Sequence, residues 1–229
     1  MGQHGGLFSA FRQPHRFRDR REAGRLLAPL LREYAGREGV VVLALPRGGV
    51  PVAYEIACAL RAPLDVFTVR KLGVPGHEEL AMGAIATGGA RVLDRELIAL
   101  LRIPSEVVEE IAAIEQRELE RRERLYRDDR PFPELSGKAV ILVDDGLATG
   151  ASMRAAIDAL RPLGPARIVA AIPVAPVESF AAVRAAADDA VCYEIPTRFG
   201  GVGAWYVDFG QTTDDEVRAL LAEASARRL

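Results

Sequence analysis

The sequence predicts an α/β fold in which a parallel β-sheet is flanked by helices. Two stretches carry this prediction, because residues 40–61 and 140–163 each read as a strand, a short glycine-containing loop and a helix. Both strands are continuous apolar runs without polar alternation, which is typical of parallel strands buried on both faces. A chain of 229 residues with 49% hydrophobic content can bury one large core, so we expect residues 17–229 to form a single domain.

The first half of the chain alternates between helical and strand patterns. Leucines recur at helical spacing between charged residues after Phe17, and Gly36 closes that segment. Two apolar runs rich in β-branched residues follow, separated by a second helical pattern. The predicted elements are a helix over 17–36, a strand over 40–45, a helix over 50–61 and a strand over 64–69.

Residues 72–89 form a glycine-rich connection with few apolar anchors. A connection of this length is usually mobile or functional, so we expect a mobile loop here. His77 lies within it, and a surface histidine or an acid–base group are both open interpretations. Arg70 and Lys71 would stand at the end of the preceding strand.

The second half repeats the alternation around the strand over 140–143. A long charged helix over 105–127 precedes that strand, and its glutamates and arginines need no ligand. Thr213 and Glu216 form a capping box for a C-terminal helix. The remaining predicted elements are a helix over 151–163, strands over 167–174 and 190–195, and a helix over 177–187, which gives a sheet of about five strands by this count.

Composition limits the function classes. The net charge is −2, so no global field recruits nucleic acid. Two cysteines in apolar surroundings indicate core thiols in a reducing cytoplasm, and neither a membrane span nor a secretory signal is recognisable. We therefore expect a cytoplasmic protein with a flexible leader over 1–16.

The most informative segment reads VILVDDGLATGAS, from Val140 to Ser152. Asp144 and Asp145 end the buried strand, and a small-residue loop then leads into a helix. The unpaired N–H groups of a helix N-terminus can cradle a phosphate without a cationic side chain. Paired carboxylates suit the neighbouring hydroxyls of a sugar, directly or with a divalent cation. The segment matches neither a Walker P-loop nor a dinucleotide-binding fingerprint.

This pattern resembles the diphosphate-sugar signature of the type I phosphoribosyltransferases, which have a Rossmann-like sheet with a small hood. The resemblance implies that Asp144 and Asp145 hold the ribose hydroxyls of phosphoribosyl diphosphate and, with it, Mg²⁺. The loop that would bind its 5-phosphate is made of Ala148, Thr149, Gly150, Ala151 and Ser152.

Further positions follow from the same resemblance. The turn of Arg47, Gly48 and Gly49 looks like the pyrophosphate loop of the family, with glycines free to take positive φ. Lys71 resembles the lysine that family members direct at the leaving diphosphate. The loop over 72–89 would be the flexible lid that excludes water.

The aromatic-rich segment 193–212 resembles the hood of the purine-salvage enzymes. The resemblance implies that Trp205 stacks on a base and that Asp208 approaches a second metal ion, while Tyr206 and Phe209 are expected in the core. One departure concerns Ala148, because the 6-oxopurine enzymes carry an aspartate there as the proposed general base. Hypoxanthine or guanine is therefore a doubtful acceptor.

We expect a cytoplasmic, Mg²⁺-dependent phosphoribosyltransferase that uses a nitrogen acceptor, possibly as a homodimer as in many family members. A regulatory protein that binds phosphoribosyl diphosphate or a nucleotide with little catalysis is the alternative. A phosphatase or kinase ranks third, because no nucleophile motif accompanies the two acids. RNA or DNA binding is disfavoured, since glutamates interleave with the arginines of helix 105–127.

Overall fold

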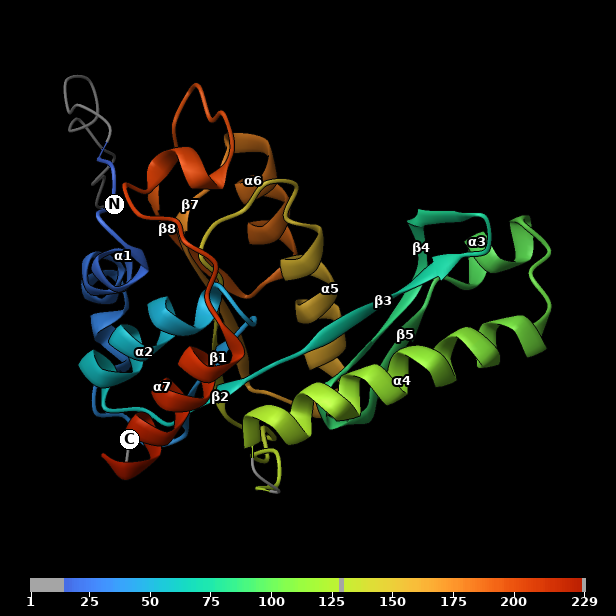
Figure 1. Ribbon diagram of the computed structural model, residues 1–229, viewed down its shortest axis with the longest axis horizontal. Coiled ribbons are helices and arrows are strands. Elements are labelled where there is room, and N and C mark those ends of the chain that lie inside the picture. The colour runs from blue at the N-terminus through green and yellow to red at the C-terminus, as the bar shows by residue number, and fades with distance from the viewer. Residues whose placement is uncertain (1–14, 128–129, 228–229) are drawn as a thin grey trace, which may run out of the picture.

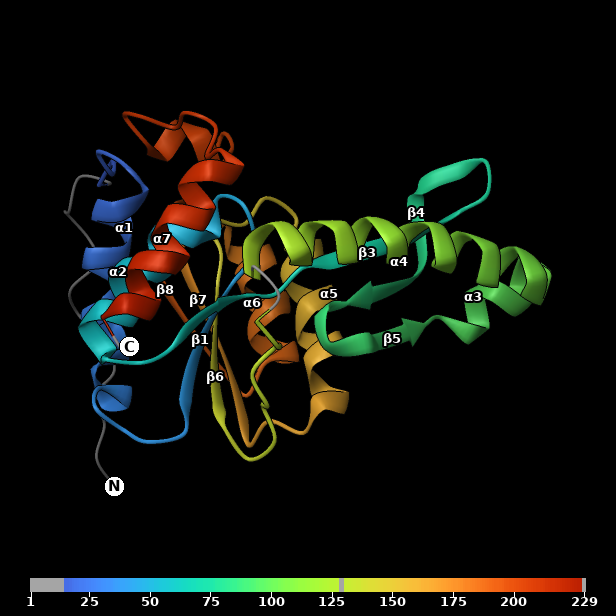
Figure 2. The same ribbon diagram turned by 60° about the horizontal axis from the view of Figure 1, so that its bottom comes forward.

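The computed structural model describes residues 15–127 and 130–227, without the side chains of residues 78 and 79. Fourteen residues of the expected leader therefore lie outside the described part. The centre is a five-stranded parallel sheet, which confirms the predicted fold class (Figures 1 and 2). In spatial order its strands are β2 (Leu64–Val66), β1 (Val40–Ala44), β6 (Ala139–Val143), β7 (Arg167–Val174) and β8 (Asp189–Glu194).

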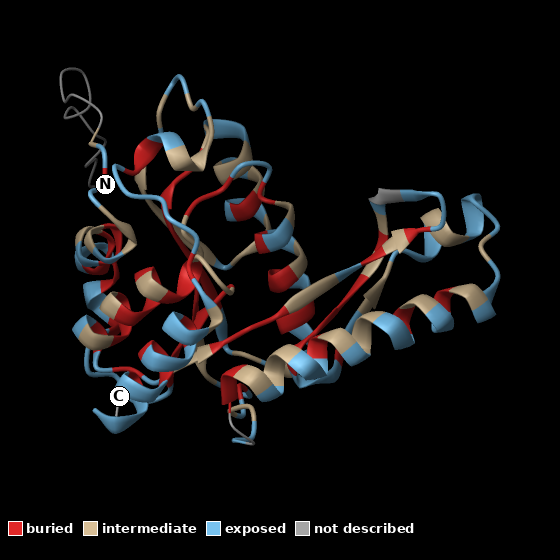
Figure 3. Ribbon diagram, viewed as in Figure 1, coloured by how far each residue is buried: buried red, intermediate tan, exposed pale blue. Residues whose placement is uncertain are grey.

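Helices cover both faces of this sheet. One face carries α1 (Arg20–Leu27), α2 (Gly49–Leu60) and α7 (Asp214–Ala226), and the other carries α5 (Ala151–Leu160) and α6 (Val177–Ala186). Alternate residues of each central strand enter the two cores, so that Ile141 packs on the first face and Leu142 on the second. Figure 3 shows these central strands as the most continuous buried segment of the chain.

The N-terminal helix is shorter than predicted. It begins at Arg20 because the Asp19 side chain caps it by accepting from the Glu22 N–H at 2.7 Å. Pro29 then changes the geometry, since proline has no N–H for an α-helical bond, and the chain continues as a 3₁₀ helix, η1 (Ala28–Tyr34). A similar 3₁₀ turn, η3 (Arg161–Leu163), ends the helix predicted over 151–163.

The largest correction concerns residues 69–100. The predicted strand over 64–69 ends at Val66, and the expected loop over 72–89 is an antiparallel sheet of β3 (Val69–Val74), β4 (His77–Ala86) and β5 (Ala90–Leu93). Glycines of this segment serve its turns, because Gly76 and Gly88 take φ of 76° and 80°. A short 3₁₀ turn, η2 (Thr87–Gly89), joins β4 to β5.

These three strands and two helices form an arm that projects from the main sheet (Figures 1 and 2). The helices are α3 (Arg95–Leu100) and α4 (Ser105–Arg127), the second with the predicted bounds. The arm has its own small core, in which Leu72, Met82 and Leu119 are fully or almost fully buried. Among the described residues, no helix of the chain is long and apolar enough to cross a membrane.

The ends of β1 and β6 position the candidate site. The two strands pair in parallel from Val40 with Ala139 to Ala44 with Val143, so both end at the same edge. The turn 46–49 and the acidic pair after Val143 therefore emerge side by side, as expected for ligand sites of open parallel sheets.

Candidate functional site

Asp144 and Asp145 lie together at the end of β6, and each carboxylate has one engaged oxygen. Oδ1 of Asp144 accepts from the Asp145 N–H at 2.9 Å. Oδ2 of Asp145 accepts from Nε of Arg20 at 2.8 Å. The described contacts leave Oδ2 of Asp144 and Oδ1 of Asp145 as the remaining acceptors of the pair.

Burial and mutual repulsion oppose ionisation of this pair. Loss of solvation and the nearby Asp145 charge raise the pKa of Asp144 well above its ordinary value. Burial also raises the pKa of Asp145, while the Arg20 guanidinium acts in the opposite direction. A ligand that brings hydroxyl donors or a cation would relieve this repulsion.

Asp144→Asn is expected to stabilise the ligand-free protein by roughly 1 kcal/mol at neutral pH, because it removes a disfavoured charge and keeps an acceptor for the Asp145 N–H. Since the raised pKa means that ionisation destabilises the fold as pH rises, the gain should shrink on acidification, where the wild-type group is already neutral. Urea unfolding at neutral and acidic pH measures it. A loss of stability at neutral pH would contradict this account.

The loop after the acids forms a small cradle at the N-terminus of α5. A cavity of about 120 Å³ is lined by Asp144 and by residues 146–153, which include the predicted Ala148, Thr149, Gly150, Ala151 and Ser152. Gly150 takes φ 71° as the N-cap, and the first helical bond runs from the Arg154 N–H to the Gly150 carbonyl. Of the earlier amides of this turn, the Ala151 N–H donates to Oγ1 of Thr149 at 3.3 Å, which leaves the Ser152 and Met153 N–H groups for a ligand. No basic side chain is among the lining residues, so amide dipoles would bind an anion here.

The turn of residues 46–49 presses directly against the acidic pair, and its Pro46–Arg47 peptide bond is cis. A Cβ at Gly48 would lie 2.1 Å from Oδ2 of Asp145, and one at Gly49 would lie 2.7 Å from the Val143 carbonyl oxygen. Neither glycine has positive φ, and Gly48 has φ −60°. The expected reason for these glycines was therefore wrong, because close approach and not a left-handed backbone requires them.

Two residues that sequence reasoning missed hold Asp145 in place. Arg20 approaches from α1, and the hydroxyl of Tyr206 donates to the Asp145 carbonyl oxygen at 2.6 Å. Both are far from Asp145 in the sequence, and Arg20 stands among other charged residues. No local pattern distinguishes either residue.

The two predicted diphosphate ligands have different positions. NH1 of Arg47 lies 3.8 Å from Oδ1 of Asp214, at the start of α7. Lys71 is exposed within the arm, opposite Ala84 on β4, and is not at the end of a parallel strand. The expected position of Lys71 was therefore wrong, because the chain leaves the sheet at Val66.

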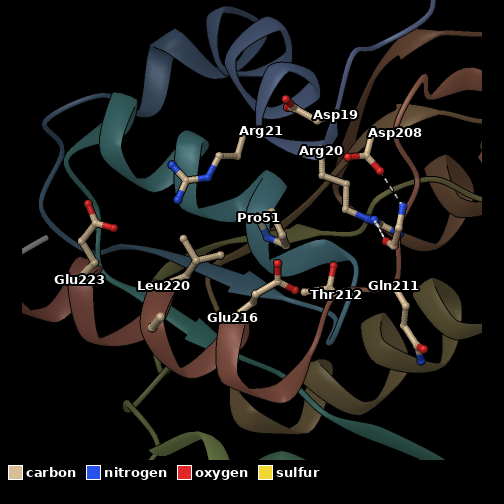
Figure 4. A pocket seen from close by; sticks show the side chains of 12 residues that line it. Asp19, Arg20, Arg21, Pro51, Asp208, Gln211, Thr212, Glu216, Leu220 and Glu223 are labelled. Carbon is tan, nitrogen blue, oxygen red and sulfur yellow. Dashed lines mark hydrogen bonds between the residues drawn. The ribbon is translucent and has the colours of Figure 1, made fainter.

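Asp208 lines a different cavity from the acidic pair. Its Oδ1 accepts from the Gly210 N–H at 3.0 Å, and it borders a groove of about 440 Å³ between α1, α2 and α7 (Figure 4). The described residues contain no group of three or more His, Cys, Asp or Glu side chains that could hold a metal ion. A metal-binding role for Asp208 stays a prediction.

Trp205 is buried, which argues against its predicted role in stacking on a base. It is 7% exposed within the 3₁₀ turn η4 (Val202–Trp205), and its Nε1 donates to the Phe199 carbonyl at 2.8 Å. Tyr206 is in the core as expected. Phe209 is not, because it is 37% exposed, stacked on Tyr206 at 5.0 Å between ring centroids.

Trp205→Phe is expected to lower stability by about 2 kcal/mol, because a phenyl ring leaves a void and an unpaired carbonyl. Urea unfolding followed by far-UV circular dichroism measures this loss, with exposed Val207→Ala as the matched control. A change in ligand preference with unchanged stability would instead support the stacking role.

The acidic pair fits a divalent cation that arrives with a phosphorylated ligand. Mg²⁺ usually keeps several waters and binds one or two carboxylates together with substrate phosphates. Asp144 and Asp145 offer two such carboxylates beside an anion cradle. Full coordination would therefore depend on oxygen atoms from the ligand and from water.

Three comparisons relate this chain to known proteins. A family model described as the phosphoribosyl transferase domain matches residues 18–210. A Mycobacterium tuberculosis protein provisionally named a phosphoribosyl transferase is 44% identical over 208 residues, which cover 91% of this chain and 47% of that protein. This chain thus spans about half the length of that relative.

The crystal structure of TT1426 from Thermus thermophilus has the same fold, with a TM-score of 0.81 and 47% identity over 91% of this chain and 98% of that one. A Roseiflexus protein named bifunctional protein PyrR is 32% identical over 157 residues, 67% of this chain and 65% of that protein.

Proposed function

Because this chain belongs to the phosphoribosyl transferase domain family, we propose that it is a Mg²⁺-dependent phosphoribosyltransferase. It would displace diphosphate from phosphoribosyl diphosphate by a nitrogen nucleophile, with nucleobases as the first acceptors to test. One observation carries the proposal: two carboxylates, a helix N-terminal cradle and a glycine turn meet at one edge of the sheet.

Each part of the substrate has a matching feature. The free oxygens of Asp144 and Asp145 would accept the two ribose hydroxyls. The cradle of residues 146–153 would take the 5-phosphate on the Ser152 and Met153 amides of the first helical turn. The turn over 46–49 lies against the acids, where the diphosphate at C1 would find the Arg47 guanidinium.

The reaction breaks the bond between C1 and the diphosphate oxygen and forms a bond between C1 and nitrogen. The electron pair of the broken bond leaves with diphosphate, and the nitrogen releases its proton to solvent. Mg²⁺, when held by Asp144, Asp145 and the substrate, would supply positive charge against the leaving group. The residues of this chain mainly position the ribose and offset charge that develops on diphosphate.

The regulatory alternative keeps the same binding site without turnover. Two observations favour it: Ala148 places no carboxylate in the phosphate loop, and Lys71 lies on the arm. The role of Lys71 towards the leaving diphosphate stays a prediction. The formation of a homodimer also stays a prediction.

The test is calorimetric titration with phosphoribosyl diphosphate, with Mg²⁺ and with a chelator, followed by a diphosphate-release screen over purine and pyrimidine bases. Mg²⁺-dependent binding together with release in the presence of one base supports the enzyme and identifies its acceptor. Binding without release favours the regulatory protein. Absence of binding would overturn the assignment of the site.

A further inference from the structure

Arg20 reaches the acidic pair from the first helix of the described chain. It is the first residue of α1 and lies 125 positions before Asp145. Its side chain is only 12% exposed, although arginine usually keeps its charge in water. A buried guanidinium needs partners for its N–H groups, and these partners define what Arg20 does.

Three contacts fix the plane of this guanidinium. Nε donates to Oδ2 of Asp145 at 2.8 Å, and NH1 donates to the Gly210 carbonyl at 2.6 Å. The Phe209 ring covers the group, with its centroid 4.0 Å from Cζ. Figure 4 shows the Arg20 side chain along the wall of the groove, on the side of Asp208 and pointing away from Arg21.

The same contacts define the orientation of the Asp145 carboxylate. Oδ2 is held by Arg20 and has the Cα of Gly48 directly beside it, where no Cβ could fit. Rotation of the carboxylate would break its charge-assisted bond, so Oδ1 is the oxygen left for a ligand.

The backbone of Asp145 is held through the same aromatic group. Phe209 stacks on Tyr206, and the Tyr206 hydroxyl donates to the Asp145 carbonyl oxygen at 2.6 Å. Asp145, Arg20, Phe209 and Tyr206 thus form a closed ring of contacts. Displacement of Arg20 would release the Asp145 side chain, while the hydrogen bond from Tyr206 would still hold the Asp145 main chain.

We propose that Arg20 is a positioning residue that holds Oδ2 of Asp145 so that Oδ1 faces a ribose hydroxyl. This role rests on the proposed function, because the hydroxyl belongs to the phosphoribosyl substrate. A simpler role would be to tie α1 to the sheet. A substitution of Arg20 would weaken ligand binding if Arg20 positions Asp145, whereas it would lower only the stability of the fold if Arg20 ties α1 to the sheet.

Arg20→Gln is expected to weaken Mg²⁺-dependent binding of phosphoribosyl diphosphate about 10- to 100-fold, the usual effect of removing a group that orients a ligand. Arg20→Lys should recover part of this loss, since lysine keeps the charge but cannot make both bonds in one plane. Arg21→Gln is the matched control, because Arg21 is more exposed and contacts Glu55 at 3.4 Å. Calorimetry measures the affinities, and circular dichroism verifies the fold.

A second measurement needs no ligand. Thermal melting of Arg20→Gln, Asp145→Asn and the double variant should show strong coupling, so that the change in melting temperature of the double variant differs clearly from the sum of the two single changes. The role of Arg20 would be overturned if the wild-type protein binds phosphoribosyl diphosphate and Arg20→Gln binds it with an affinity within about twofold of the wild-type value. An absence of coupling between the two substitutions would overturn it as well. Coupling without any wild-type binding would instead overturn the sugar-diphosphate site, and with it this role.

Discussion

Asp145→Asn is expected to weaken binding of phosphoribosyl diphosphate and Mg²⁺ by at least about 100-fold. One hydrogen bond to a charged group is worth roughly 1.5–3 kcal/mol, and a tenfold change in affinity is about 1.4 kcal/mol. The asparagine also removes a negative charge from the acidic pair at the end of β6, so attraction for the cation falls as well. Calorimetric titration measures the change.

The control is Asp158→Asn, which removes an equal charge from an exposed position on α5, outside the site. Asp145→Asn deprives the Arg20 guanidinium of its charged partner but also removes a carboxylate whose pKa is raised by burial, so any gain in stability should be smaller than that of Asp144→Asn. Both isosteric changes are expected to weaken binding. Wild-type affinity in Asp145→Asn would refute the assignment of the site.

Local sequence determines the part of this site that could be predicted. The strand, the acidic pair and the phosphate loop are contiguous from Val140 to Ser152, so their order alone places them at a strand end and a helix N-terminus. The residues that hold Asp145 in place come from distant parts of the sequence. Arg20 and Tyr206 reach Asp145 over 125 and 61 positions, and neither stands out from its neighbours.

The arm illustrates a different reason for failure. Its glycines resemble those of a loop, but Gly76 and Gly88 occupy turns between strands whose inward residues include Leu72 and Met82. The glycine content of residues 72–89 indicated a flexible loop. These two glycines lie in the turns, however, and the residues between them form a strand. The stacking role of Trp205 was inferred from the resemblance of its segment to the hood, whereas its buried position depends on Phe17 and Val174, which belong to the same core cluster but come from distant parts of the chain.

Gly48→Ala tests the contact between the glycine turn and the acidic pair. The added Cβ would lie 2.1 Å from Oδ2 and 2.7 Å from Cγ of Asp145, so either the turn or the carboxylate must move. We expect a stability loss of about 1–3 kcal/mol, which is typical of overpacking. We also expect activity or affinity to fall about 100-fold, since a displacement of about 1 Å has this effect at reacting centres. Urea unfolding and the binding titration measure the two effects separately.

A second substitution separates the steric cause from a change in backbone freedom. Asp145→Ala removes the atoms that the new methyl group would meet, so Gly48→Ala should be far less destabilising in that background, although binding stays lost. Gly210→Ala is the matched control, because its Cβ would approach only Oδ1 of Asp208, at 3.3 Å. If Gly48→Ala is equally destabilising with and without Asp145, the cost arises in the turn itself. The close packing of turn and acid would then not be the reason for glycine at position 48.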